Sequence, residues 1–147
     1  MKENSLKIPF AKTFLTALFA GIIATCVCFI FEIWYRVATF YGPSDFVNVS
    51  SIIFIVNFLL LLAGIAYFAF KSWFSNGDLI YVAFSVLISI FCIWEISKIH
   101  EFADIKQNRE FIQLLNGITI IIGVASLCIP YFYNNRKINN FFYEAKV

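Results

Sequence analysis

Charged residues are scarce in this chain, and their scarcity limits what the protein can be. Only 14% of its 147 residues are Asp, Glu, Lys or Arg, whereas a soluble domain has about 25%. Hydrophobic residues make up 61% and aromatic residues 20%. The formal net charge is +2 and no basic run occurs outside the tails, which argues against nucleic acid as a partner. The composition is typical of a membrane protein.

Residues that usually carry catalysis or bind metals are also few. The chain has one histidine and no Cys-x-x-Cys, glycine-rich phosphate loop or nucleophile elbow. His100 could share a metal ion with Asp104 and a neighbouring glutamate, but one histidine among flexible acids favours a solvated loop. Four cysteines lie in apolar runs, where they are expected to pack as small apolar residues: Cys26, Cys28, Cys92 and Cys128. We therefore expect no metal and no cofactor.

Long segments without any charge indicate the fold. A helix rising about 1.5 Å per residue needs about 20 residues to cross a hydrocarbon core of about 30 Å. The first apolar run has no small-residue cleavage site and is therefore interpreted as a spanning helix, not a signal peptide. The sequence predicts an all-α integral membrane protein, one domain over residues 1–147, with four transmembrane helices at about 10–36, 46–72, 79–100 and 111–134.

The distribution of lysine and arginine predicts the orientation. Seven of these residues lie on the side of the N-terminus and four on the other side. Positive residues concentrate on the cytoplasmic side of membrane proteins, so both termini are predicted to be cytoplasmic. The expected location is the bacterial inner (plasma) membrane.

Two segments sixty residues apart suggest an internal repeat. Residues 31–34 read Phe-Glu-Ile-Trp and residues 91–94 read Phe-Cys-Ile-Trp. Asn57 and Gly64 recur as Asn116 and Gly123, with an offset of fifty-nine. Two tandem helical hairpins would produce this pattern, and so would chance, because few identities are involved.

Three short motifs carry a resemblance to a known group of proteins. They are "AGIIAT" in the first helix, "FKSWFSNGD" between the second and third helices, and "LLNG" at the start of the fourth. With these motifs the chain resembles small bacterial four-helix membrane proteins grouped as a domain of unknown function. The resemblance implies a fold and a membrane location, and it implies no activity and no site residues.

Small residues on the first helix predict a packing face. They recur at spacings of three or four, which places them on one side of a helix: Ala17, Gly21, Ala24 and Cys28, followed by Glu32. Small residues let membrane helices approach closely, so this face is expected to point into the bundle with Gly21 at a tight contact.

Polar residues near the predicted outer surface form the candidate site, and Arg36 can pair with Glu32 one turn away. Asparagine inside a membrane can bind a ligand or join helices. An acid at a helix end can line a site or form an interfacial ion pair. Both interpretations stay open for the candidate cluster, which comprises Glu32, Arg36, Asn57, Glu95 and Asn116.

Three classes of function are compatible with these features. The first is a non-enzymatic membrane protein that acts through helix packing, as a homo-oligomer or with a membrane-protein partner. The second is a small carrier or channel with a polar, acidic site in the outer half of the bundle. The third is a membrane enzyme that acts on a lipid or quinone. The lipid bilayer is the expected surrounding in each case.

Overall fold

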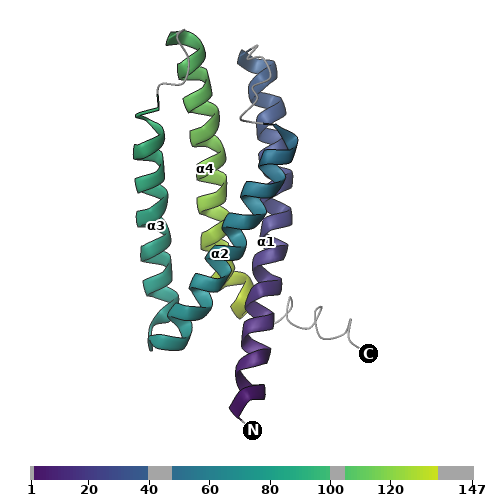
Figure 1. The fold of residues 1–147 in the computed structure, drawn as a ribbon, viewed down its shortest axis with the longest axis vertical. Coiled ribbons are helices and arrows are strands. Elements are labelled where there is room, and N and C mark those ends of the chain that lie inside the picture. Colours follow the sequence, from purple (N-terminus) through teal and green to yellow (C-terminus); the bar gives the residue numbers. More distant parts are fainter. Residues whose placement is uncertain (1, 40–47, 100–104, 136–147) are drawn as a thin grey trace.

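The computed structural model describes residues 2–39, 48–99 and 105–135, with side chains from residue 10 onward. Within these residues the chain forms four α-helices and no β-strand (Figure 1). Their bounds are α1 (Lys2–Thr39), α2 (Val49–Trp73), α3 (Gly77–Ile96) and α4 (Ile105–Asn134). Each contains a stretch long and apolar enough to cross a membrane. The predicted fold class, all-α with four membrane-spanning helices, is confirmed.

The helix ends differ from the ranges that the charge-free runs predict. α2 begins at Val49 because Asn48 caps it: the Asn48 Oδ1 accepts a hydrogen bond from the Ser51 N–H at 2.9 Å, and the Ser51 Oγ accepts from the Asn48 N–H at 3.0 Å. α3 ends at Ile96, four residues before the predicted end. α4 begins at Ile105, six residues early, because Lys, Gln, Arg and Glu are good helix formers outside the apolar core.

The small face of α1 packs against α2. Ala17 and Cys28 are fully buried, and a Cβ added to Gly64 of α2 would collide with the Ala17 side chain. A Cβ added to Gly21 would lie 2.7 Å from the Asn57 Oδ1, closer than atoms in contact can approach. The predicted tight contact at Gly21 is confirmed, and it joins α1 to α2.

The four helices do not contact one another equally. α1 packs on α2 and α4, and α3 packs on the same two helices, whereas the described residues of α1 and α3 make no close backbone approach. α2 crosses the bundle obliquely, near α1 where it begins and near α3 where it ends (Figure 1). α2 therefore diverges from α3 towards the end of the bundle where α3 stops.

Two antiparallel hairpins, α1–α2 and α3–α4, build the bundle, but their packing registers differ. Gly64 of α2 meets Ala17, near the start of the α1 span. The corresponding Gly123 of α4 meets Ser89, in the middle of α3. The hairpin topology of the predicted repeat is present, and the equivalent glycines serve different contacts.

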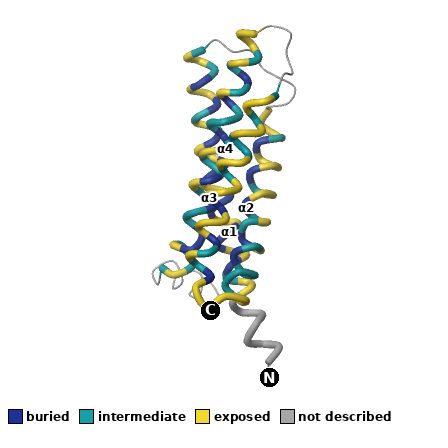
Figure 2. Tube along the Cα trace, turned by 90° about the vertical axis from the view of Figure 1, so that its left-hand side faces the viewer, coloured by how far each residue is buried: buried dark blue, intermediate teal, exposed yellow. Residues whose placement is uncertain are grey.

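Burial follows the facing sides of the helices, and exposed positions cover their outer sides (Figure 2). Many exposed positions carry large apolar residues, including Ile30, Phe54 and Leu87. A soluble monomer rarely exposes contiguous apolar surface on this scale. The outer surface is therefore suited to hydrocarbon. Burial on α3 is confined to the first half of the helix, at Gly77, Tyr81 and Ser85.

Candidate functional site

A groove of about 510 Å³ lies between α2, α3 and α4. Its lining residues fall between Leu59 and Ala66 on α2, between Tyr81 and Ile96 on α3, and between Thr119 and Ser126 on α4. Most of them are aliphatic or aromatic, and Glu95 is the one carboxylate among them. We call this feature the α2–α3–α4 groove.

Three buried hydroxyl groups meet at one end of the groove. The Ser126 Oγ lies 2.9 Å from the Tyr81 Oη and 2.7 Å from the Ser85 Oγ, and the Tyr81 hydroxyl also reaches the Ser126 carbonyl at 3.2 Å. All three residues are at least nine-tenths buried. Buried hydroxyls are costly without partners, so this mutual bonding stabilises the contact between α3 and α4.

Pro130 explains why a tyrosine is needed there. Proline has no N–H, so a proline at position 130 leaves the carbonyl of Ser126, four residues earlier, without its helical donor. In a membrane an unpaired carbonyl is expensive, because no water can replace the bond. The Tyr81 hydroxyl donates to this carbonyl from the neighbouring helix, and α4 continues to Asn134.

The other hydroxyls of the groove also bond within the protein. The Ser89 hydroxyl donates to the Ser85 carbonyl and the Thr119 hydroxyl donates to the Leu115 carbonyl, both at 2.9 Å. Their hydrogens are therefore already engaged inside their own helices. The wall of the groove behaves as an apolar surface, although its sequence contains several hydroxyl residues.

The predicted residues Glu32 and Arg36 form an ion pair on α1. The Arg36 Nε and Nη2 each lie 2.9 Å from the Glu32 Oε1, and Glu32 is only 7% exposed. Glu32 therefore points towards the bundle interior, as the small face of α1 predicts. Nearby on α1, the Tyr35 hydroxyl donates to the Gln113 Oε1 of α4 at 3.0 Å and so links the two helices.

The two predicted asparagines occupy different surroundings. The Asn57 Nδ2 donates to the Thr25 Oγ1 of α1 at 3.0 Å and to the Ile53 carbonyl at 2.8 Å, so Asn57 joins α1 and α2. The Asn116 Oδ1 is buried and has no hydrogen-bond partner among the described residues.

Glu95 lies apart from Glu32. It is at the end of the groove near the C-terminus of α3, about half exposed, and its Oε1 lies 2.9 Å from the Lys98 Nζ. The Lys98 ammonium also lies 3.2 Å from the centroid of the Trp94 ring. No hydrogen bond or ion pair of the described chain links Glu32 with Glu95, since they belong to the two helices that do not pack together. The predicted cluster is therefore divided among several local contacts.

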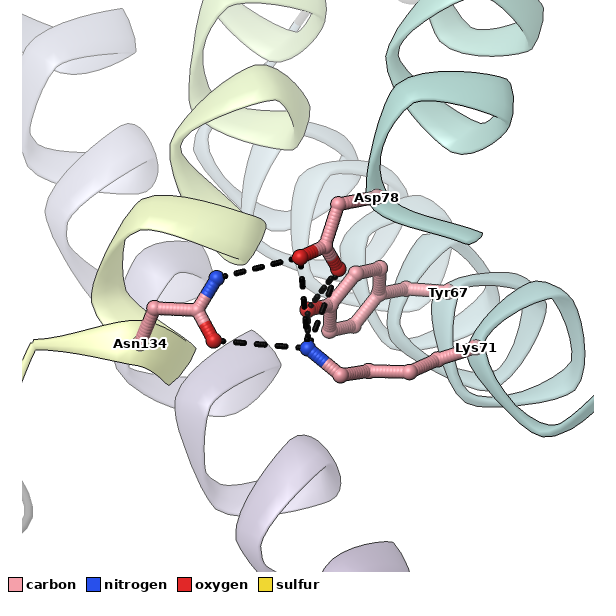
Figure 3. Close-up of polar contacts among 4 residues, drawn as sticks. All are labelled: Tyr67, Lys71, Asp78 and Asn134. Carbon is pink, nitrogen blue, oxygen red and sulfur yellow. Dashed lines mark hydrogen bonds and ion pairs between the residues drawn. The ribbon is translucent and has the colours of Figure 1, made fainter. Parts of the chain in front are cut away.

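A polar cluster at the opposite end of the bundle was not predicted. The Asp78 carboxylate accepts from the Tyr67 hydroxyl at 2.7 Å, the Lys71 ammonium at 3.0 Å and the Asn134 Nδ2 at 3.2 Å (Figure 3). The Lys71 ammonium also donates to the Tyr67 Oη at 2.9 Å. These side chains come from α2, α3 and α4, and they tie the three helices together.

One feature of the sequence could have indicated part of this cluster. Lys71 and Asp78 carry opposite charges on either side of the Asn76-Gly77 turn, and a tight turn returns such residues to each other. A Cβ at Gly77 would lie 2.6 Å from both the Lys71 Cα and the Phe70 carbonyl oxygen, so only glycine permits this close return. The contribution of Asn134 depends on the packing of α4 and leaves no local pattern.

The described residues contain no group of three or more His, Cys, Asp or Glu side chains placed to hold a metal ion. His100 and Asp104 lie outside the described residues. Comparison of the chain with family models, curated proteins and solved structures finds no match in any of the three. A proposal for the function therefore rests on the geometry of the bundle.

Proposed function

We propose that this small membrane protein binds one extended hydrocarbon chain of a lipid-like molecule in the α2–α3–α4 groove. The shape of the groove carries the proposal. Its lining on α3 runs from Tyr81 to Ile96, about 22 Å at about 1.5 Å per residue. The groove offers about 510 Å³ along this length.

This length and volume suit a single hydrocarbon chain. Carbon atoms in contact lie about 3.5–4.0 Å apart, so a polymethylene chain is thin enough to lie lengthwise in the groove. The volume also falls within the roughly 300–1,000 Å³ of ordinary ligand sites, which are mostly apolar with a few polar groups.

The chemistry of the lining supports the same occupant. The hydroxyl hydrogens of Ser89 and Thr119 are engaged by backbone carbonyls, so neither is available to a ligand carbonyl. A hydrocarbon chain requires no hydrogen bond from the wall. The polar end of such a molecule would leave the groove at Glu95, beside the ion pair with Lys98.

The other classes of function receive less support. Packing with a second copy or a partner protein was inferred from the small face of α1, which already lies against α2 at Ala17 and Gly21. A carrier or channel needs polar groups along its path, and Glu95 is the only carboxylate among the described residues that line the groove. An enzyme acting on a lipid or quinone needs a reactive group beside its substrate, and the groove hydroxyls are occupied with protein partners.

The orientation is part of the proposal. With seven lysine and arginine residues on the side of the N-terminus and four on the other, we propose that both termini lie in the cytoplasm of a bacterial cell. The Glu95 end of the groove then opens to the outer leaflet.

A photoreactive fatty acid tests the proposal. Purified protein in mild detergent is irradiated with a diazirine-labelled palmitic acid, and labelled residues are mapped by mass spectrometry. We expect labelling to concentrate on the groove-lining parts of α3 and α4. Replacing Ala63, which lines the groove, by phenylalanine should fill part of the volume and reduce this labelling severalfold.

Ala83 provides the matched control, since it is exposed on α3 and does not line the groove. Ala83→Phe adds the same side chain to the lipid-facing surface and should leave groove labelling unchanged. Labelling spread evenly over all exposed helix faces, and equal in both variants, would show that no chain occupies the groove.

A further inference from the structure

Two lysines from different helices lie against one tyrosine ring at the end of the bundle opposite Glu95. The Lys12 Nζ of α1 lies 4.0 Å from the centroid of the Tyr133 ring, and the Lys71 Nζ of α2 lies 4.5 Å from the same centroid. The two ammonium nitrogens can therefore be no more than 8.5 Å apart, the sum of these distances. Cations attract an aromatic face, which holds both in place.

Among the described residues, the charges at this end do not cancel. Asp78 is the only carboxylate that the described residues bring to the two lysines, and its oxygens are shared by Lys71, Tyr67 and Asn134. One carboxylate neutralises one ammonium. Lys12 forms no ion pair within the described part of the chain, so the cluster keeps an excess of one positive charge.

The position of this charge suggests its ligand. Lys12 directly precedes the charge-free run of α1 and Lys71 directly follows that of α2, so both ammonium groups lie near one membrane surface. Lysine extends its ammonium to such a surface along an apolar stem. Basic pockets between membrane helices on the cytoplasmic side bind anionic lipid headgroups. The Lys71 ammonium gives its three hydrogens to Tyr67, Asp78 and Asn134, which leaves the Lys12 ammonium to bind an anion.

We propose that Lys12, with the positive charge of Lys71 beside it, binds the phosphate group of an anionic phospholipid headgroup. The Tyr133 ring positions the Lys12 ammonium, and Asp78 and Asn134 hold the Lys71 ammonium near the same ring. This site is separate from the groove, because it involves α1 and the groove does not. Either proposal can therefore be disproved without affecting the other.

The test compares two phospholipids with identical chains. Native mass spectrometry of the protein in mild detergent measures the affinity for phosphatidylglycerol and for phosphatidylcholine. Lys12→Gln should weaken phosphatidylglycerol binding about fivefold, the effect of one lysine near an anionic surface. It should leave phosphatidylcholine binding unchanged. Lys12→Arg keeps the positive charge and should keep the preference for the anionic lipid.

Lys98 supplies the matched control, since it is also a lysine over an aromatic ring but lies at the other end of the bundle. Lys98→Gln should not change phosphatidylglycerol binding. Equal affinities for the wild type and Lys12→Gln, or an equal loss in Lys98→Gln, would overturn the proposal. Binding of soluble glycerol phosphate with the same dependence on Lys12 would assign the site to a free phosphate and overturn the lipid assignment.

Discussion

Gly21 is one of the residues where α1 and α2 lie in close contact. Its Cα faces the Asn57 side chain, which in turn donates a hydrogen bond to Thr25 one turn further along α1. Glycine thus makes room for an asparagine that bonds back to the same helix. Interhelical hydrogen bonds of this kind contribute about 0.6 kcal/mol on average, and the close packing adds to it.

Replacing Gly21 by leucine should therefore destabilise the bundle. The new Cβ would lie 2.7 Å from the Asn57 Oδ1, so the helices must separate or Asn57 must leave Thr25. Overpacking of this kind typically costs about 1–3 kcal/mol. Thermal unfolding in detergent measures the loss, with Ala83→Leu on the exposed side of α3 as the control. Equal melting temperatures for both variants and the wild type would contradict the contact.

Residue patterns within one helix could be predicted, and contacts between helices could not. The spacing of Ala17, Gly21 and Cys28 alone predicts that this face is buried, because side chains three and four apart share a side. The burial of Glu32 is predicted by the same spacing, because Glu32 lies four residues after Cys28. The partner of Asn57 and the hydroxyl cluster at Ser126 depend on which helices become neighbours, and no local spacing specifies that.

α4 continues past a proline because another helix completes its hydrogen bonding. Pro130 removes the donor for the Ser126 carbonyl, and the Tyr81 hydroxyl of α3 replaces it at 3.2 Å. The position of the charge-free runs predicts all four helices. Their ends are not predicted, because α4 begins in a charged segment outside the apolar core, where helix propensity and not hydropathy decides.

A double-mutant cycle tests the link between Tyr81 and Pro130. Tyr81→Phe removes the donor to the Ser126 carbonyl and should cost about 1–3 kcal/mol, the penalty for a buried unpaired group. Pro130→Ala restores a backbone N–H, so the same tyrosine change should cost less in that background. The expected coupling is about 0.5–1 kcal/mol or more in unfolding experiments. Strictly additive effects would show that the Tyr81 hydroxyl does not replace the hydrogen bond that Pro130 removes.

At the scale of the whole molecule, the oblique path of α2 creates the groove. α2 lies near α1 where it begins and near α3 where it ends, so α3 loses contact with it towards Glu95 (Figure 1). Three of the residues that line the groove, Ser85, Ser89 and Cys92, have the spacing of one face of α3. The space in front of that face was not predictable, since it follows from a crossing angle between helices.

The central claim is that a hydrocarbon chain, and not water, fills this space. Ala63 and Thr119 line the groove from α2 and α4, and their methyl groups can report on it by nuclear magnetic resonance in lipid nanodiscs. We expect nuclear Overhauser effects from both methyl groups to acyl-chain methylene protons and none to water, because an apolar cavity stays dry. Strong effects to water and none to the chain at these two methyl groups would contradict the claim and favour a hydrated path through the bundle.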